Sequence, residues 1–169
     1  MANTTGICEK IYCANGFYFG DPCYALDEKL YEAWIEWGRE RERTEGRWCN
    51  DGKFVYEGKE IMCVDSTAYG DGYYEGVHMN YGVDAGCLAL IPLEFCNREG
   101  FEMLGLVVRD FSGTALFESD GDSGSFYVEW FYNERGWESE NVKTGESVED
   151  SEDEDPYEYD SVYGRDANR

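Results

Sequence analysis

Three aspartates in glycine-rich stretches are the residues of this chain whose types and spacing could do chemistry. Asp21 lies in GDPCYAL, Asp71 in TAYGDGYYEG and Asp84 in YGVDAG. If the fold brings them together, the three carboxylates could hold a hard cation such as Ca²⁺ or Mg²⁺, and two of them could act as a general acid and a general base. The alternative is that each aspartate caps its own turn, because Asp side chains accept hydrogen bonds from nearby backbone N–H groups. We favour the turns and keep the metal site as the alternative.

The glycines of TAYGDGYYEG do not match a phosphate-binding loop. Such loops follow GxxxxGK[ST] or GxGxxG between a strand and a helix, whereas here the spacing differs, no lysine follows and Asp71 would repel a phosphate. Asp71 and Gly72 lie between residues of strand character and instead predict a tight hairpin turn, since glycine adopts the positive φ that such turns need. The alternative is a loop that also presents Asp71, Tyr73 and Tyr74 to a partner.

The other chemically active residues form no catalytic motif. None of the seven cysteines shares a CxxC spacing with another, and His78 is the single histidine, so a zinc site is not predicted. Cys23 as a nucleophile would need an imidazole that nothing in the sequence places beside it. The chain has no P-loop and no GxSxG motif, and SDGDSGS departs from the EF-hand pattern. We therefore predict no catalytic residues and no cofactor, and we do not expect an enzyme.

The charge of the chain restricts its partners. Lysine and arginine number 14 against 37 acidic residues, which gives a formal net charge of −23. Contacts to nucleic-acid phosphates and to anionic lipids require basic side chains, so we expect neither direct nucleic-acid binding nor membrane binding. A basic protein surface is the partner that this charge favours, and acidity that serves only solubility is the alternative.

The N-terminal residues and the apolar runs predict a cytoplasmic protein. The start MANTTG has neither the basic nor the apolar region of a secretory signal. No apolar run reaches the roughly 20 residues that a membrane span needs. The cysteines are then expected to be thiols, most of them buried in the core.

One segment has the periodicity of a helix. In DEKLYEAWIEWGRERER, Asp27 is placed to cap the start, and a leucine, an alanine and two tryptophans fall on one face. On the opposite face, Glu36 with Arg39 and Glu40 with Arg43 are helical neighbours of opposite charge. We therefore expect a helix whose aromatic side packs on the core and whose arginines are partly neutralised.

Short strands separated by glycine-rich turns account for most of the remaining chain. The sequence predicts hairpins around EGK and around SDGDSG. The predicted strands are 16–20, 53–56, 61–64, 79–83, 87–93, 103–108, 114–118 and 125–132. This pattern indicates an α+β fold, mainly antiparallel β, arranged as a sandwich or a small barrel with the one helix packed on it.

The chain is expected to divide into a globular domain over residues 1–137 and an acidic tail over residues 138–169. Residues 138–160 hold eleven acidic side chains and one lysine, and apolar periodicity ends near Glu138. Like charges repel along such a stretch, which is typical of disorder.

The two motifs resemble those of an uncharacterised group of small bacterial and bacteriophage proteins that carry a DPCY element and a downstream YGDG element. In this chain the elements are D-P-C-Y from Asp21 to Tyr24 and Gly70-Asp71-Gly72 after Tyr69, and the similarity covers about residues 17–92. The resemblance implies a cytosolic, β-rich accessory protein with no established activity.

Two functional hypotheses follow. The favoured one is a non-catalytic acidic binding protein. Its narrower form is a phage-type inhibitor that imitates nucleic acid and blocks the basic groove of a host defence or nucleic-acid-binding protein. Duplex DNA carries one charge per ~1.7 Å of its axis, so such imitation needs a dense, ordered acidic face. The alternative is a divalent-cation-binding or metal-dependent domain that uses Asp21, Asp71 and Asp84.

Overall fold

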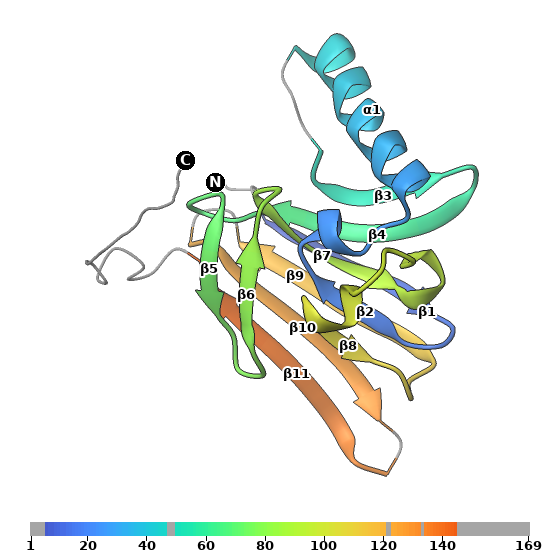
Figure 1. The fold of residues 1–169 in the computed structure, drawn as a ribbon, viewed down its shortest axis with the longest axis vertical. Coiled ribbons are helices and arrows are strands. Elements are labelled where there is room, and N and C mark those ends of the chain that lie inside the picture. The colour runs from blue at the N-terminus through green and yellow to red at the C-terminus, as the bar shows by residue number, and fades with distance from the viewer. Residues whose placement is uncertain (1–5, 47–49, 121–122, 133, 145–169) are drawn as a thin grey trace.

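The computed structural model describes residues 6–46, 50–120, 123–132 and 134–144, which form two antiparallel sheets, a separate hairpin and one long helix (Figure 1). The strands are β1 (Ile7–Cys13), β2 (Phe17–Gly20), β3 (Gly52–Tyr56), β4 (Lys59–Ser66), β5 (Gly72–Glu75), β6 (Asn80–Val83), β7 (Cys87–Pro92), β8 (Leu106–Val108), β9 (Gly113–Asp120), β10 (Ser125–Tyr132) and β11 (Gly136–Lys143). The helix is α1 (Glu28–Glu45), and three short 3₁₀ helices are η1 (Pro22–Tyr24), η2 (Leu93–Phe95) and η3 (Phe101–Met103).

The layers stack in the order sheet, sheet, helix. The first sheet has the strand order β1-β9-β10-β11, and the second has the order β3-β4-β7-β2-β8. The hairpin β5–β6 forms a two-stranded sheet beside β11 (Figure 1). The mainly antiparallel fold with one packed helix is confirmed, and because the described strands close no barrel, the sandwich is the predicted form that the chain adopts.

The two central strands explain where the core lies. Every residue of β2 and β7 is buried, which is why both read as continuous apolar runs rather than as alternating ones. Phe17 and Phe19 of β2 point into the core between the two sheets, where they contact Trp130 and Phe117 of the first sheet. Tyr18, between them, belongs to the second core under α1 and the 3₁₀ helices.

The helix begins and packs as its sequence predicts. The Asp27 side chain accepts hydrogen bonds from the backbone N–H groups of the first turn, at 2.9 Å for Lys29. Trp34 is buried, and its indole N–H donates to the backbone carbonyl of Asn50 at 2.8 Å. On the exposed face Arg43 pairs with Glu40 at 2.7 Å, one of the predicted pairs.

The hairpin turns divide into two confirmed predictions and one that is wrong. The EGK stretch joins β3 to β4, with Glu57 and Gly58 at positive φ, and β9 pairs with β10 across the SDGDSG stretch, of which residues 121–122 lie outside the described residues. Asp71 and Gly72, however, form no hairpin turn. Gly72 begins β5, and residues 67–71 are a connection between the second sheet and the separate hairpin. The strand-like flanks of Asp71 and Gly72 do not show which strands pair with each other, and the strands on the two sides of this motif, β4 and β5, do not pair.

The boundary expected at residue 137 is wrong, because β11 continues the first sheet to Lys143. Its residues pair with β10 from Gly136 opposite Tyr132 to Lys143 opposite Ser125. Glu140, Val142 and Thr144 are buried. The sequence of β11 lacks the apolar alternation of a strand, because its buried residues are one glutamate, Glu140, and one valine, Val142. The rest of the expected tail, residues 145–169, lies outside the described residues.

None of the described helices has the length and apolar character that crossing a membrane requires.

A chain that ends at Trp137 should be much less stable than a chain that ends at Thr144. The shorter chain loses most of β11, exposes the edge of β10 and removes a buried valine, whose burial alone contributes roughly 1.5–3 kcal/mol. We expect the free energy of unfolding in urea to fall by several kcal/mol, or the cooperative transition to disappear. Equal midpoints for the two chains would show that β11 does not stabilise the sheet.

Candidate functional site

Asp21 lies at the end of β2 and caps the following turn. It is fully buried, and its Oδ1 accepts a hydrogen bond from the backbone N–H of Cys23 at 2.8 Å. Pro22 occupies the first position of η1, where its fixed φ suits the start of a helix and the missing N–H is not needed. The sequence GDPCY therefore builds a rigid turn between β2 and the start of the helical layer.

The second oxygen of Asp21 binds a segment distant in sequence. Oδ2 accepts the backbone N–H groups of Asp84 at 2.5 Å and of Ala85 at 2.7 Å, both in the turn between β6 and β7. Both carboxylate oxygens are therefore occupied by backbone donors. This side chain joins the GDPCY turn to the VDAG turn.

The side chain of Asp84 completes the link from the other side. Its Oδ2 accepts a hydrogen bond of 2.5 Å from the Tyr24 hydroxyl. Burial, followed by the Asp84 carboxylate, raises the pKa of Tyr24 above its usual range, which keeps the phenol protonated as the donor. The Tyr18 hydroxyl donates to the backbone carbonyl of Asp21 at 2.9 Å.

Asp71 lies at the edge of the same cluster. Partial burial, then the negative charges of Asp84 and Asp21, raise its pKa, while the backbone N–H of Gly86 acts in the opposite direction. The structure therefore brings together the three aspartates that the sequence indicated. Their oxygens bind backbone N–H groups and a phenol, and the described residues contain no group of three or more His, Cys, Asp or Glu side chains that could hold a metal ion. Only Asp21 caps its own turn, whereas the side chains of Asp84 and Asp71 interact with groups distant in sequence, so the expectation that each aspartate caps its own turn is wrong for these two. The metal alternative stays a prediction.

The Cys23 thiol is placed within this cluster but is not activated. It is half-buried, and burial followed by the charge of Asp21 raises its pKa well above the usual range. A nucleophilic cysteine needs the opposite shift, because the thiolate is the reactive form. Burial likewise raises the pKa to about 12 for Cys13, Cys63 and Cys87.

A second buried carboxylate, which the sequence did not indicate, holds the hairpin against the first sheet. Glu140 of β11 accepts the backbone N–H groups of Val77 at 2.8 Å and His78 at 3.2 Å, and the Tyr81 hydroxyl at 2.5 Å. A ring nitrogen of His78 bonds the backbone carbonyl of Ser139 at 2.8 Å. The one histidine of the chain is thus a structural contact. Nothing in a stretch rich in acids distinguishes this glutamate from its exposed neighbours.

The predicted partner-binding residues do not all reach the surface. Tyr73 is 81% exposed and Asp71 is exposed, as a binding loop requires. Tyr74 is only 3% exposed, and its hydroxyl donates to the backbone carbonyl of Gly70 at 2.8 Å, so its assignment to a binding surface is wrong. Alternate residues of a strand point to opposite faces, and β5 places Tyr74 on the core side.

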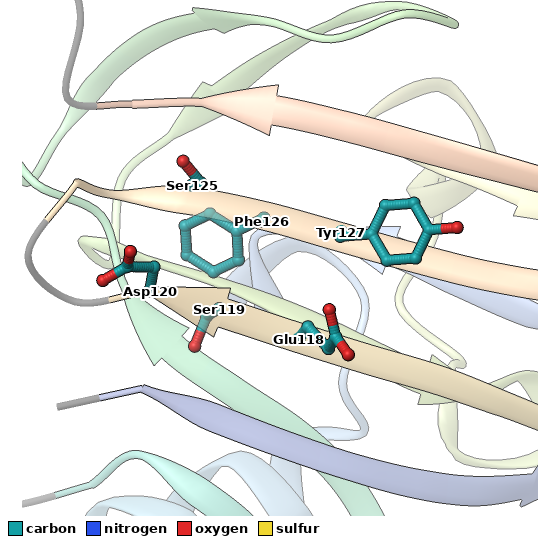
Figure 2. A pocket seen from close by; sticks show the side chains of 6 residues that line it. All are labelled: Glu118, Ser119, Asp120, Ser125, Phe126 and Tyr127. Carbon is teal, nitrogen blue, oxygen red and sulfur yellow. The ribbon is translucent and has the colours of Figure 1, made fainter. Parts of the chain in front are cut away.

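A hollow of about 130 Å³ lies at the hairpin end of β9 and β10. Figure 2 shows the side chains that line it. Ser119, the one hydroxyl here with a buried partner, donates to Asp65 Oδ2 at 2.5 Å and is thereby held in the core. The lining offers two carboxylates, two serine hydroxyls and two aromatic rings. The lining residues are Glu118, Ser119, Asp120, Ser125, Phe126 and Tyr127.

Comparison with known proteins adds no assignment. No family model, no curated protein and no solved structure matches the chain. The resemblance to small bacterial and bacteriophage proteins with DPCY and YGDG elements stays a prediction.

Asp71→Asn should stabilise the protein slightly at neutral pH. The folded-state pKa of Asp71 is raised, so the ionised side chain opposes folding above that pKa. This penalty disappears once the pH falls below the unfolded pKa of about 3.9. We expect a gain of less than about 1 kcal/mol at pH 7, because solvent screens this exposed group, and no gain at pH 3 to 4.

The matched control is Glu75→Gln, an exposed acid on β5, the strand that directly follows Asp71. Urea unfolding of both variants and the parent chain across pH 3–7 measures the effect. A gain for Asp71→Asn that persists unchanged at pH 3, or an equal gain for Glu75→Gln, would contradict the repulsion among the three aspartates.

Proposed function

We propose that this protein is a non-catalytic acidic binding protein whose partner is a basic protein surface. The observation that carries this proposal is that the side chains that could do chemistry make structural contacts within the fold. Asp21, Glu140 and His78 bind backbone groups of the chain itself. Asp84 accepts the Tyr24 hydroxyl, and burial raises the pKa of the Cys23 thiol, which favours its protonated form. What remains for function is the surface, and the surface is acidic.

The net charge of −23 supports a basic partner through long-range attraction. Complementary potentials steer association and raise its rate, and they discriminate against partners of the same sign. The same charge opposes binding of nucleic acid itself. The proposed partner is therefore a protein with exposed lysine and arginine.

Imitation of nucleic acid is the narrower form of this proposal, in which the partner's basic surface is a nucleic-acid-binding groove of a host protein. It would need acids repeated at close spacing on one face. On the outer face of the first sheet, the acids Glu118, Asp120 and Glu129 alternate with Lys10, Lys143 and aromatic side chains. This described face supports protein recognition more strongly than a copy of phosphate spacing.

The proposal is tested by affinity capture from the native host after nuclease treatment, at low and at high salt. We expect a basic protein that binds at about 50 mM salt and elutes by about 500 mM, because exposed charge pairs are screened as the Debye length shortens. The purified pair should form a complex with the same salt dependence.

Two outcomes would contradict the proposal. One is a partner that is acidic or whose affinity is independent of salt. The other is direct binding of nucleic acid by the purified protein. If the partner is a nucleic-acid-binding protein, displacement of its nucleic acid by this chain would support the narrower form, and a ternary complex would contradict that form alone.

A further inference from the structure

The outer face of the first sheet is a surface that the described fold leaves uncovered. Phe117 of β9 and Phe126 of β10 are buried in the core. Glu118 and Tyr127, the next residues along these strands, lie on the opposite, outer face (Figure 2). The helix covers the far side of the second sheet, two layers away (Figure 1). Within the described ranges, no element packs over the outward side chains of β1, β9, β10 and β11.

Three large aromatic side chains lie exposed at one end of this face. Trp137 is 65% exposed, Tyr12 is 60% exposed and Phe131 is 43% exposed. Phe131 lies directly opposite Trp137, with 5.1 Å between ring centroids, and Tyr12 lies opposite Thr114 at the same end of the sheet. Exposed aromatic residues on a rigid sheet are typical anchors of protein interfaces.

A carboxylate stands beside these rings. Glu129 precedes Phe131 by two residues and therefore shares its face, and the Tyr127 hydroxyl donates to Glu129 at 2.5 Å. Glu118 extends the acidic side chains along the face, and Lys10 of β1, opposite Leu116, is a basic side chain on the same face. An aromatic ring offers a face on which a planar guanidinium can stack, and a carboxylate beside the ring can accept hydrogen bonds from that guanidinium.

The protein already pairs arginine with aromatic rings elsewhere. The guanidinium carbon of Arg135 lies 3.7 Å from the ring centroid of Tyr132, and that of Arg41 lies 4.4 Å from Trp37. Among the described residues no such pairing involves Tyr12, Phe131 or Trp137. These three rings are open to a cation from another molecule.

We propose that the row Tyr12, Phe131 and Trp137, with Glu129, binds an arginine-rich segment of the partner protein. This inference rests on the proposed function and adds the surface and the chemistry of the bound segment. Guanidinium groups would stack on the rings and form paired hydrogen bonds with the carboxylate. Lysine, a compact and strongly hydrated charge, does this less well, so the face selects arginine over lysine.

The test measures fluorescence anisotropy of two labelled peptides with the full chain at about 150 mM salt. The peptides carry the same charge, with four Arg-Gly-Ser repeats in one and four Lys-Gly-Ser repeats in the other. We expect the arginine peptide to bind about three- to tenfold more tightly. In Trp137→Ala this preference should be lost, whereas Tyr69→Ala, which removes an exposed ring on the connection before the separate hairpin, should retain it.

A second variant, Glu129→Gln, keeps the rings and removes the carboxylate, so it should weaken the arginine peptide while the unfolding midpoint stays near that of the parent. Equal binding of the two peptides, or a preference that survives Trp137→Ala, would overturn the assignment of this face and leave the acidic binding protein intact. Failure of both peptides to bind at about 50 mM salt would overturn the face and the proposed function together.

Discussion

A carboxylate buried without a basic partner is the constraint around which this fold is organised. Removing a charge from water is costly unless hydrogen bonds replace its hydration. Asp21 is fully buried, and no described ion pair includes it, so three backbone N–H groups from two separate turns supply those bonds. The turn after β2 and the turn before β7 must therefore stay together. These turns flank the two central strands, which carry both cores.

A second buried carboxylate bound by backbone N–H groups lies where the hairpin β5–β6 meets the first sheet. Glu140 binds backbone N–H groups of the hairpin loop and the Tyr81 hydroxyl. Gly76 is required beside it, because a Cβ there would come within 2.8 Å of the glutamate's Oε2. Acids that the sequence offers for chemistry are thus acceptors within the fold. The exposed rings of Tyr12, Phe131 and Trp137, by contrast, face solvent.

Local features were predictable from the sequence because their physics is local. The Asp27 cap, the ion pairs of α1 and the EGK turn depend on residues within one turn of each other. The sequence indicates Asp21, Asp71 and Asp84 as residues that could meet but cannot show that they do, because their proximity depends on contacts between segments about sixty residues apart. β11 was missed, because Glu140 resembles its acidic neighbours until its partners on the hairpin are known. The partner strands of β5 were likewise beyond what alternation can show.

The central claim is that Asp21 is a structural acceptor, and denaturant unfolding of Asp21→Asn tests it directly. The free energy of unfolding is measured for parent and variant, once with a chelator and once with millimolar Ca²⁺ and Mg²⁺ at constant ionic strength. The account predicts a loss of about 2–3 kcal/mol, equal in both buffers, because an amide cannot accept all three backbone bonds and leaves a buried donor unpaired. A variant as stable as the parent in chelator, with a difference that appears only when the cations are added, would contradict it and make the aspartates a metal site.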